Sequence, residues 1–322
     1  MPDDGFVLTR PLDEAVIADA LPGLLSPRKT LPPKLFYDDE GCRLFGEITQ
    51  VPEYYLTRTE LSLLEAIAPG VAALCPPGGA LVEYGASDES KAEFLLRQTL
   101  SGQPVFSAYV PIDVAESALR QVAGRLLVSH PELAVHALAA DFLCPITLPA
   151  QIGGLPRLGF FPGSTIGNLE PEQARLFLQQ VRQTLGQGAR LLIGVDLRKD
   201  PERLIPAYDD AAGVTAAFNL NILARLNRDA GANFDLDAFS HQAVWNEAKS
   251  RIEMHLVSDT AQTVTIAGRQ IEFRADETIH TENSYKWTIG DFVRLAQRSG
   301  WAALQVWTDE DSLFSTHLLE AA

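Results

Sequence analysis

Short apolar runs alternate with amphipathic stretches through the middle of the chain. The apolar runs lie at 80–85, 109–113, 135–140, 158–161 and 190–196. Between them apolar residues recur at helical spacing, so strand and helix alternate. This alternation predicts an α/β fold with a parallel sheet, in which right-handed crossovers bring the carboxyl ends of the strands to one edge. The nearly continuous apolar character of the last two runs is typical of strands covered on both faces.

The segments on either side of this region have different patterns. Residues 1–60 are rich in prolines and aromatic residues, and a helix is expected at 40–49. Apolar residues lie along one helical face at 61–74. Residues 197–250 are interpreted as helices, including one at 211–228.

The last part of the chain favours strands and one more helix. Alternating apolar residues predict strands within 251–273, ending in a hairpin. A helix at 288–299 and strands at 303–307 and 314–319 follow, and these strands would complete a seven-stranded sheet. We therefore expect two domains, a sheet domain formed by 61–196 with 288–322 and an α+β domain formed by 1–60 with 197–287.

Three strand ends, spaced 28 residues apart, carry residues suited to a nucleoside cofactor. Gly85 would let the backbone approach the ligand, and Asp113 could accept hydrogen bonds from both ribose hydroxyls. Asp141 and Phe142 would meet the amine and the ring of an adenine. Ligands of such sheets bind at the edge where the strands end. The pattern favours S-adenosylmethionine.

A dinucleotide cofactor is the alternative, and it needs three glycines in the pattern G-x-G-x-x-G. No second glycine follows Gly85, and a pyrophosphate would meet Asp88 and Glu89, which is electrostatically unfavourable. S-adenosylmethionine has no phosphate. Taken singly, Gly85 could instead mark a tight turn, and Asp113 and Asp141 could cap helices.

Composition and charge narrow the possible partners. The net charge of −16 argues against nucleic acid and against an anionic membrane, which leaves a small molecule. The three cysteines form no C-x-x-C motif, and the six histidines show neither H-x-H nor H-x-x-x-H spacing, so no metal site is predicted. The acidic start at 1–4 has no apolar signal core, and no apolar run approaches the length of a membrane span. We expect a monomeric, soluble protein of the cytoplasm.

Long and unusual sequence blocks point to a function. They lie at 29–38, 52–60, 163–169, 207–219, 234–239, 251–254 and 281–284. With these blocks the chain resembles the L-histidine Nα-methyltransferases of ergothioneine biosynthesis, over nearly its whole length from about residue 28. That family transfers three methyl groups in turn from S-adenosylmethionine to the α-amine of histidine, which gives hercynine. The resemblance implies a Rossmann-like class I methyltransferase sheet and a second domain that binds the substrate.

The resemblance also implies the residues of both binding sites. Cofactor contacts fall on Tyr37, Gly85, Lys91, Asp113, Asp141 and Phe142. Histidine contacts fall on Tyr54, Asn168, Tyr208, Met254, Glu282 and Ser284. Tyr37 and Asn168 would be the catalytic pair that orients the amine, because a direct displacement needs an aligned lone pair rather than a strong base.

Within the implied histidine site, Glu282 and Ser284 would bind the imidazole. In an extended segment, side chains two residues apart point to the same face. Tyr208 and Asn168 would bind the substrate carboxylate through neutral hydrogen bonds. Small residues such as Gly163 are expected to leave room for the methyl groups.

The first loop departs from the Gly-Ser-Gly-like pattern of the family. Ser87 stands where a second glycine is usual, and Asp88 brings a charge near the methionine end of the cofactor. Asp88 is interpreted as a helix N-cap in preference to a contact with the methionyl ammonium. Two other functions stay open. One is methylation of another amine, such as a tryptophan derivative, which would not need Glu282 and Ser284. The other is a binding or regulatory protein that no longer methylates.

Overall fold

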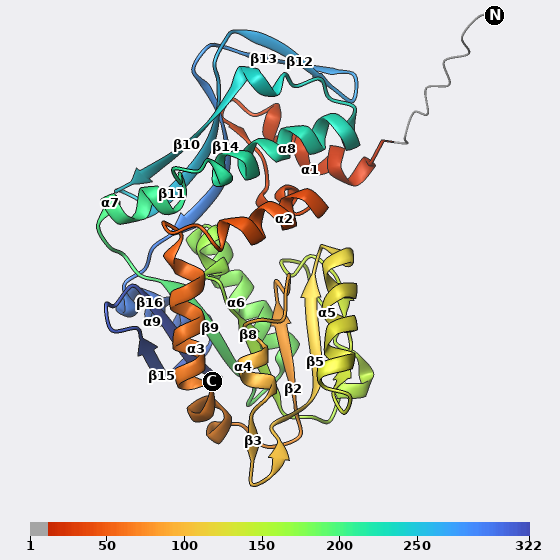
Figure 1. The fold of residues 1–322 in the computed structure, drawn as a ribbon, viewed down its shortest axis with the longest axis vertical. Helices are drawn as coiled ribbons and strands as arrows, with labels where there is room; N and C mark the ends of the chain where they lie inside the picture. The colour runs from red at the N-terminus through yellow and green to blue at the C-terminus, as the bar shows by residue number, and fades with distance from the viewer. Residues whose placement is uncertain (1–11) are drawn as a thin grey trace, which may run out of the picture.

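The computed structural model describes residues 12–322 of the chain. The acidic start at 1–4, and with it the first part of the predicted range 1–60, lies outside the described residues. Figure 1 shows two parts stacked along the long axis: a broad sheet flanked by helices below and a smaller sheet with its own helices above. The C-terminus lies in the lower part.

The lower part is built on a sheet that we call the large sheet. Its order is β15 (Trp301–Thr308), β16 (Phe314–Ala321), β9 (Arg190–Asp196), β8 (Arg157–Phe161), β2 (Gly79–Tyr84), β5 (Phe106–Asp113) and β6 (Ala134–Val135), with β7 (Leu138–Ala139) also paired to β5. Strand β16 is antiparallel to both β9 and β15, and the other pairs are parallel. Because β6 and β7 share one position, the predicted seven-stranded α/β sheet is confirmed.

The order of the large sheet fixes where a ligand can bind. From β2 the chain proceeds to β5 and outward, whereas from β8 it proceeds to β9 on the other side. The crossovers therefore diverge between β2 and β8. In doubly wound sheets, the crevice at such a point, outside the carboxyl ends of the strands, is the ligand site.

Helices cover both faces of the large sheet. They are α3 (Tyr55–Leu74), α4 (Glu93–Leu96), α5 (Glu116–Ser129), α6 (Pro171–Leu185) and α9 (Ile289–Arg298). Helices α6 and α9 contribute Phe177 and Phe292 to one core, which also contains Val82 of β2. Leu81, the preceding residue of β2, belongs to the other core with Leu64 of α3. Since neighbouring strand residues point to opposite faces, a central strand buries both.

The upper part is built on a second sheet, the small sheet. Its order is β1 (Lys29–Thr30), β14 (Glu277–Tyr285), β11 (Arg251–Ser258) and β10 (Phe239–Asn246), and the hairpin β12 (Gln262–Ile266) with β13 (Arg269–Phe273) accompanies it. Its helices are α1 (Glu14–Leu24), α2 (Asp39–Ile48) and α8 (Val214–Ala230). One core joins residues 16–56 with residues 204–279. The domain boundaries themselves stay a prediction, and helix α3 runs across the one placed after residue 60.

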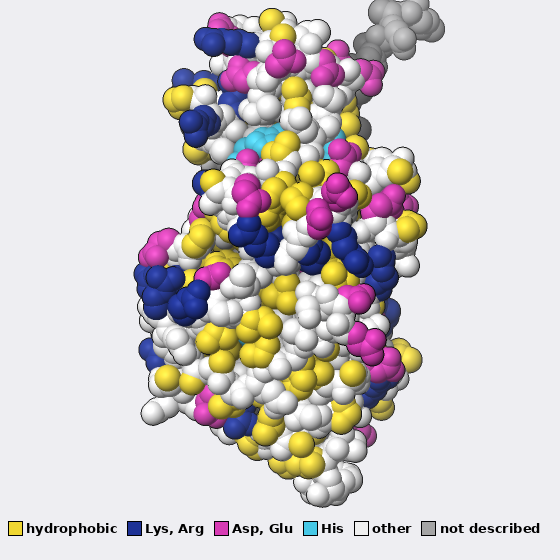
Figure 2. Space-filling model, turned by 90° about the vertical axis from the view of Figure 1, so that its left-hand side faces the viewer, with side chains coloured by type: hydrophobic (Ala, Val, Ile, Leu, Met, Phe, Trp, Pro, Cys, Tyr) yellow, Lys and Arg dark blue, Asp and Glu magenta, His cyan; other side chains and the backbone are white. Residues whose placement is uncertain are grey.

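Short elements complete the chain. They are β3 (Thr99–Leu100), β4 (Gln103–Pro104), α7 (Pro201–Leu204) and the 3-10 helices Pro33–Phe36, Ala150–Ile152, Thr165–Asn168, Ile205–Ala207 and Leu236–Ala238. Within residues 12–322, every helix is too short or too polar to cross a membrane. Figure 2 shows Lys and Arg side chains gathered at the level where the two parts meet, although the chain as a whole is acidic.

Two predicted elements differ from the structure. Residues 239–246 were expected to be helical but form β10, because pairing with β11 along its whole length outweighs the local preference. The predicted strand at 135–140 consists of two short pieces separated by His136 and Ala137. It lies at the edge of the large sheet, where β5 is its partner on one side only. The predicted hairpin and the helices α2, α8 and α9 lie where expected, within a few residues.

Acid should destabilise the fold through His317, which is fully buried on β16 against the ring of Phe292. Burial lowers the pKa of His317 to about 4, against about 6.5 in an unfolded chain. Below pH 6.5 this histidine is protonated in the unfolded chain but stays neutral in the folded chain. The free energy of unfolding therefore falls by about 3 kcal/mol as the pH drops from 6.5 to 4. Urea unfolding of the wild type and His317→Gln across this range should give a shallower pH dependence for the variant. Identical pH dependences would contradict this account.

Candidate active site

The loop after β2 adopts a conformation that requires glycine. Gly85 has a φ of +77°, which side chains rarely allow, and a Cβ there would lie 3.7 Å from Cε1 of Phe142. The N–H of Gly85 donates to the carbonyl of Ile112 at 2.8 Å, so the turn lies against the end of β5. The structure therefore places the predicted glycine loop beside the predicted adenine-binding ring.

The two predicted carboxylates lie on neighbouring strand ends. The carbonyl of Asp113 accepts a hydrogen bond from the N–H of Ala140 at 2.8 Å, which brings Asp141 alongside. Oδ1 of Asp113 accepts from the N–H of Ala115 at 2.8 Å, and Oδ1 of Asp141 accepts from that of Leu143 at 2.9 Å. Burial raises the pKa of Asp113. Both residues thus make local turn contacts, and each carboxylate keeps acceptor capacity for a ligand.

Lys91 supports the loop that follows β8. Its Nζ lies 2.7 Å from Oε2 of Glu60, a buried side chain on α3. Both carboxylate oxygens of Glu60 accept from the N–H of Gly163, at 2.9 and 2.8 Å. The direct cofactor contact predicted for Lys91 stays a prediction. Glu60 was not indicated by the sequence pattern, although it ends the block at 52–60 and lies on the buried face of α3.

A narrow cavity where the two parts meet collects the predicted histidine-binding residues. Its wall includes Tyr37, Tyr54, Gly163, Ser164, Asn168, Tyr208, Met254, Glu282 and Ser284. Nδ2 of Asn168 donates to Oε1 of Glu282 at 3.0 Å, which links the loop after β8 to β14. Folding therefore brings together residues that lie up to 247 positions apart along the chain.

Two hydroxyl groups of this cavity are fixed by a buried ammonium. Nζ of Lys286 donates to Oη of Tyr208 at 2.7 Å and to Oγ of Ser284 at 2.8 Å, and the two oxygens are 2.7 Å apart. An ammonium only donates, so Lys286 occupies a lone pair of each hydroxyl. One hydroxyl hydrogen is used between the two oxygens, and the other is left for a ligand. Lys286 was not predicted, although it follows the block at 281–284 closely.

Burial also sets the protonation states in the cavity. It raises the pKa of Tyr37, Tyr54 and Tyr208 well above the ordinary value, so these phenols stay protonated and can donate. Burial raises the pKa of Glu282 to about 7, against the opposing effects of Lys286 and of the hydrogen bond from Asn168. The cavity thus surrounds one carboxyl group with neutral donors.

The charged residues of the altered first loop bond to groups close to them. Asp88 is exposed, and its Oδ1 accepts from the N–H of Ser90 at 2.8 Å. It caps a turn, whereas the N-cap of a helix was expected, because α4 begins only at Glu93. The carboxylate of Glu89 pairs with Arg125 of α5.

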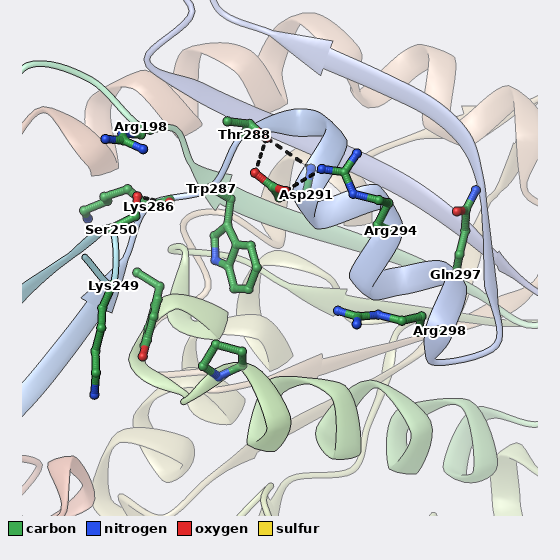
Figure 3. A pocket seen from close by; sticks show the side chains of 12 residues that line it. Arg198, Lys249, Ser250, Lys286, Trp287, Thr288, Asp291, Arg294, Gln297 and Arg298 are labelled. Carbon is green, nitrogen blue, oxygen red and sulfur yellow. Dashed lines mark hydrogen bonds and ion pairs between the residues drawn. The ribbon is translucent and has the colours of Figure 1, made fainter. Parts of the chain in front are cut away.

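A larger hollow lies beside the narrow cavity and has a different character. Figure 3 shows its basic and aromatic side chains, which include Arg198, Lys249, Trp287, Arg294 and Arg298. Lys286 borders both spaces, because it lines the hollow while its Nζ reaches Tyr208 and Ser284. No residue predicted for either binding site lines the hollow, so the narrow cavity is the candidate active site.

Comparison with known proteins identifies the family. The model of a family described as histidine-specific, S-adenosylmethionine-dependent methyltransferases matches residues 16–321. The chain belongs to this family. The resemblance seen in the sequence blocks is confirmed, and so are the class of enzyme and its cofactor, S-adenosylmethionine.

Individual relatives agree over nearly the full length of this methyltransferase. The histidine N-alpha-methyltransferase of Mycolicibacterium smegmatis is 40% identical over 311 residues, which cover 95% of this chain and 94% of the relative. The enzyme of the same name from Mycobacterium tuberculosis is 39% identical over 306 residues, which cover 94% of each chain. A 4-dimethylallyltryptophan N-methyltransferase of Claviceps purpurea is 26% identical and covers 91% of this chain and 93% of its own.

Asp113→Asn should weaken binding of S-adenosylhomocysteine by about 10- to 100-fold, because charge-assisted hydrogen bonds from the ribose hydroxyls are lost. Isothermal titration calorimetry measures the affinity. Asp88→Asn, at an exposed position in the loop after β2, is the matched control and should bind like the wild type. Equal affinities for Asp113→Asn and the wild type would remove Asp113 from the cofactor site.

Above pH 7, where Glu282 is ionised, Glu282→Gln should weaken histidine binding by about 10- to 100-fold while the affinity for S-adenosylhomocysteine stays unchanged, because the charged acceptor for the imidazole is lost. Titration of each ligand separately tests both halves. Glu272→Gln, on the exposed side of β13, is the matched control. A variant that binds histidine normally but loses the cofactor would show that the two sites are wrongly divided.

Proposed function

We propose that this methyltransferase transfers three methyl groups, one after another, from S-adenosylmethionine to the α-amine of L-histidine and so produces hercynine for ergothioneine biosynthesis. The observation that carries the proposal is the set of groups in one cavity: the carboxyl of Glu282, the amide of Asn168, and the two hydroxyls held by Lys286. The names of the two mycobacterial relatives support the same substrate.

The edge of the large sheet fits the cofactor. We assign the ribose hydroxyls to Asp113 and the adenine to Asp141 and Phe142, whose ring lies edge-on to Phe161 and Phe177. Gly85, whose positive φ favours glycine, has no side chain to obstruct that approach. When bound, S-adenosylmethionine supplies the activated methyl group.

Tyr37 and Asn168 orient the substrate amine. The displacement needs a neutral amine with its lone pair in line with the methyl group, and a protonated amine has no lone pair. Burial keeps the phenol of Tyr37 neutral, so it serves as a hydrogen-bonding partner and not as a base. The amide of Asn168 is held in place by Glu282. The amine proton leaves through water.

The imidazole-binding pair distinguishes histidine from an indole substrate. Glu282 accepts a hydrogen bond from one ring nitrogen, and the hydroxyl of Ser284 donates to the other. An indole has a single N–H and no second nitrogen, so the hydrogen bond that Ser284 donates to the imidazole would not form. The Ser284 hydroxyl keeps Lys286 and Tyr208 as partners, so the cost is the loss of one hydrogen bond, about 0.5–1.5 kcal/mol. Histidine is therefore favoured over the kind of substrate named for the Claviceps relative.

The two parts of the chain bind different ligands. We assign cofactor binding to 61–196 with 288–322 and histidine binding mainly to 1–60 with 197–287. Asn168 crosses this division, because it belongs to the loop after β8 but bonds to Glu282. We propose that a monomer is the active unit, because the predicted histidine-binding residues of a single chain already meet in the narrow cavity.

The expected methyl pocket is more constrained than its small residues suggest. Gly163 has a φ of +79° and Ser164 a φ of +56°. A bulky residue at Gly163 would strain the backbone and also crowd Nζ of Lys91, 3.3 Å from the added Cβ. Methylation states are therefore better followed in the unaltered enzyme.

The first methyl transfer should speed up as pH rises toward about 8, because a lower pH protonates the α-amine, whose ordinary pKa is about 8. Single-turnover reactions followed by mass spectrometry should show one, two and then three added methyl groups. The reaction stops there because a quaternary ammonium has no lone pair. Titration of S-adenosylhomocysteine at each pH is the control for cofactor affinity. A protein that binds both ligands and forms no methylated product would instead be the non-catalytic homologue.

A further inference from the structure

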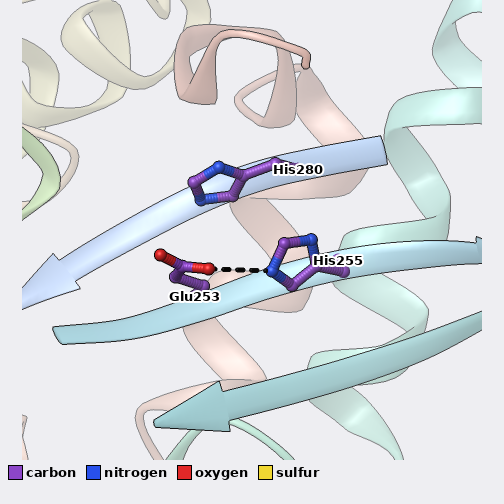
Figure 4. A group of neighbouring side chains, drawn as sticks. All are labelled: Glu253, His255 and His280. Atoms are coloured by element: carbon purple, nitrogen blue, oxygen red, sulfur yellow. Dashed lines mark hydrogen bonds and ion pairs between the residues drawn. The ribbon is translucent and has the colours of Figure 1, made fainter. Parts of the chain in front are cut away.

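A cluster of potential metal ligands lies on the small sheet, outside the narrow cavity. Glu253 and His255 of β11 and His280 of β14 each offer one ligand atom, and these atoms all lie within 4.8 Å of one another. Figure 4 shows the three side chains together, with the two imidazole rings facing each other. The ring centroids are 4.8 Å apart. No metal site was expected from the spacing of histidines, but strand pairing sets His255 opposite His280.

The hydrogen bonds of His280 leave one of its nitrogens free to bind a cation. Nε2 of His280 lies 3.0 Å from the carbonyl oxygen of Glu282, and it must be the donor because a carbonyl only accepts. A neutral imidazole then keeps its lone pair on Nδ1. A hydrogen bond from the other ring nitrogen to a carbonyl is what orients metal-binding histidines.

Glu253 is prepared to act as an anionic ligand. Its Oε1 accepts from Nδ2 of Asn246 at 2.9 Å and from Nε of Arg251 at 2.7 Å. The second oxygen, Oε2, lies 3.2 Å from Nε2 of His255. Two donors thus hold one carboxylate oxygen, and the other faces the histidines.

The cluster also contains polar atoms whose bonding capacity is unmet. Among the described residues, Nδ1 of His255 and Oδ1 of Asn283 are buried and have no hydrogen-bond partner. Asn283 stands opposite Glu253 in the strand register. Unpaired buried polar groups are uncommon, and each costs stability. A cation beside Glu253 would supply a partner for the amide oxygen.

We propose that Glu253, His255 and His280 bind a divalent first-row transition metal ion such as Zn²⁺. Two imidazole nitrogens and one carboxylate oxygen suit this class of ion, and open positions remain for water or the amide oxygen of Asn283. The guanidinium of Arg251 weakens the site by its charge, although Glu170 shares that charge. The site lies outside the narrow cavity, so it does not depend on the proposed function.

The test is a metal titration of the full chain without an affinity tag. Cys144 is an exposed free thiol, so all proteins carry Cys144→Ser. After chelator treatment, Zn²⁺ binding is measured by calorimetry and Co²⁺ binding by visible absorption. The variants Glu253→Gln, His255→Gln and His280→Gln each remove one ligand. His130→Gln is the matched control, because His130 contacts Glu93 on a distant surface.

We expect one Zn²⁺ per chain and an affinity at least about tenfold lower in each of the three ligand variants, since even outer-sphere partners of a metal contribute that much. His130→Gln should bind like the parent, and Zn²⁺ at one fixed concentration should raise the melting temperature of the parent more than that of the ligand variants. Circular dichroism without metal shows whether each variant is folded. If one ligand variant does not fold, the Zn²⁺ affinities of the other two test the proposal. A parent protein that binds no Zn²⁺, or ligand variants that bind as tightly as the parent, would overturn the proposal.

Discussion

Asp196 is the constraint on which the rest of the molecule depends. It ends β9 and is fully buried. Oη of Tyr55 donates to its carboxylate and lies 3.0 Å from Oδ1 and 2.8 Å from Oδ2. The carboxylate also pairs with Nζ of Lys199 at 2.6 Å and with Nζ of Lys286 at 2.7 Å. Its N–H donates to Oγ of Ser164 at 2.9 Å. Burial alone would raise the pKa of Asp196, but the two ammonium groups lower it. Through its carboxylate and its N–H, Asp196 therefore joins helix α3, the loop after β8 and Lys286, which directly follows β14. Removing one partner would leave a buried charge uncompensated at a cost of about 3–5 kcal/mol, so these groups must be kept together.

Buried charged residues outside the cavity hold its polar groups in position. Lys286, anchored by Asp196, fixes the hydroxyls of Tyr208 and Ser284. On the other side Glu60 binds the N–H of Gly163, the loop residue that borders both the cofactor edge and the cavity. Neither anchor needs to touch the substrate. Both position groups that do, which is how a site gains precise geometry from a rigid scaffold.

The sequence allowed the large sheet and its ligand edge to be predicted, because strand periodicity and strand-end residues are local signals. Gly85 and Asp113 follow directly from that pattern. The residues of the cavity could be predicted only through resemblance to a family, since they come from segments that are distant in the sequence. Glu60, Asp196 and Lys286 gave no such signal, because a charged residue in an apolar run reveals its partner only after folding. Strand β10 was mistaken for a helix for a similar reason: its partner β11 decides its conformation.

The cavity must also accept an amine that becomes a permanent cation. Once the nitrogen is quaternary, it can no longer exchange hydrogen bonds with groups such as Asn168. The rings of Tyr37, Phe45, Tyr54 and Phe218 line the same cavity and contact one another edge to face, with centroids 6.0–6.4 Å apart. Aromatic faces attract quaternary ammonium groups. As methyl groups replace hydrogens, the stabilising contacts would pass from the hydrogen-bonding groups to these rings. The same burial that keeps the phenols neutral, and so unable to act as bases, therefore suits the charged product.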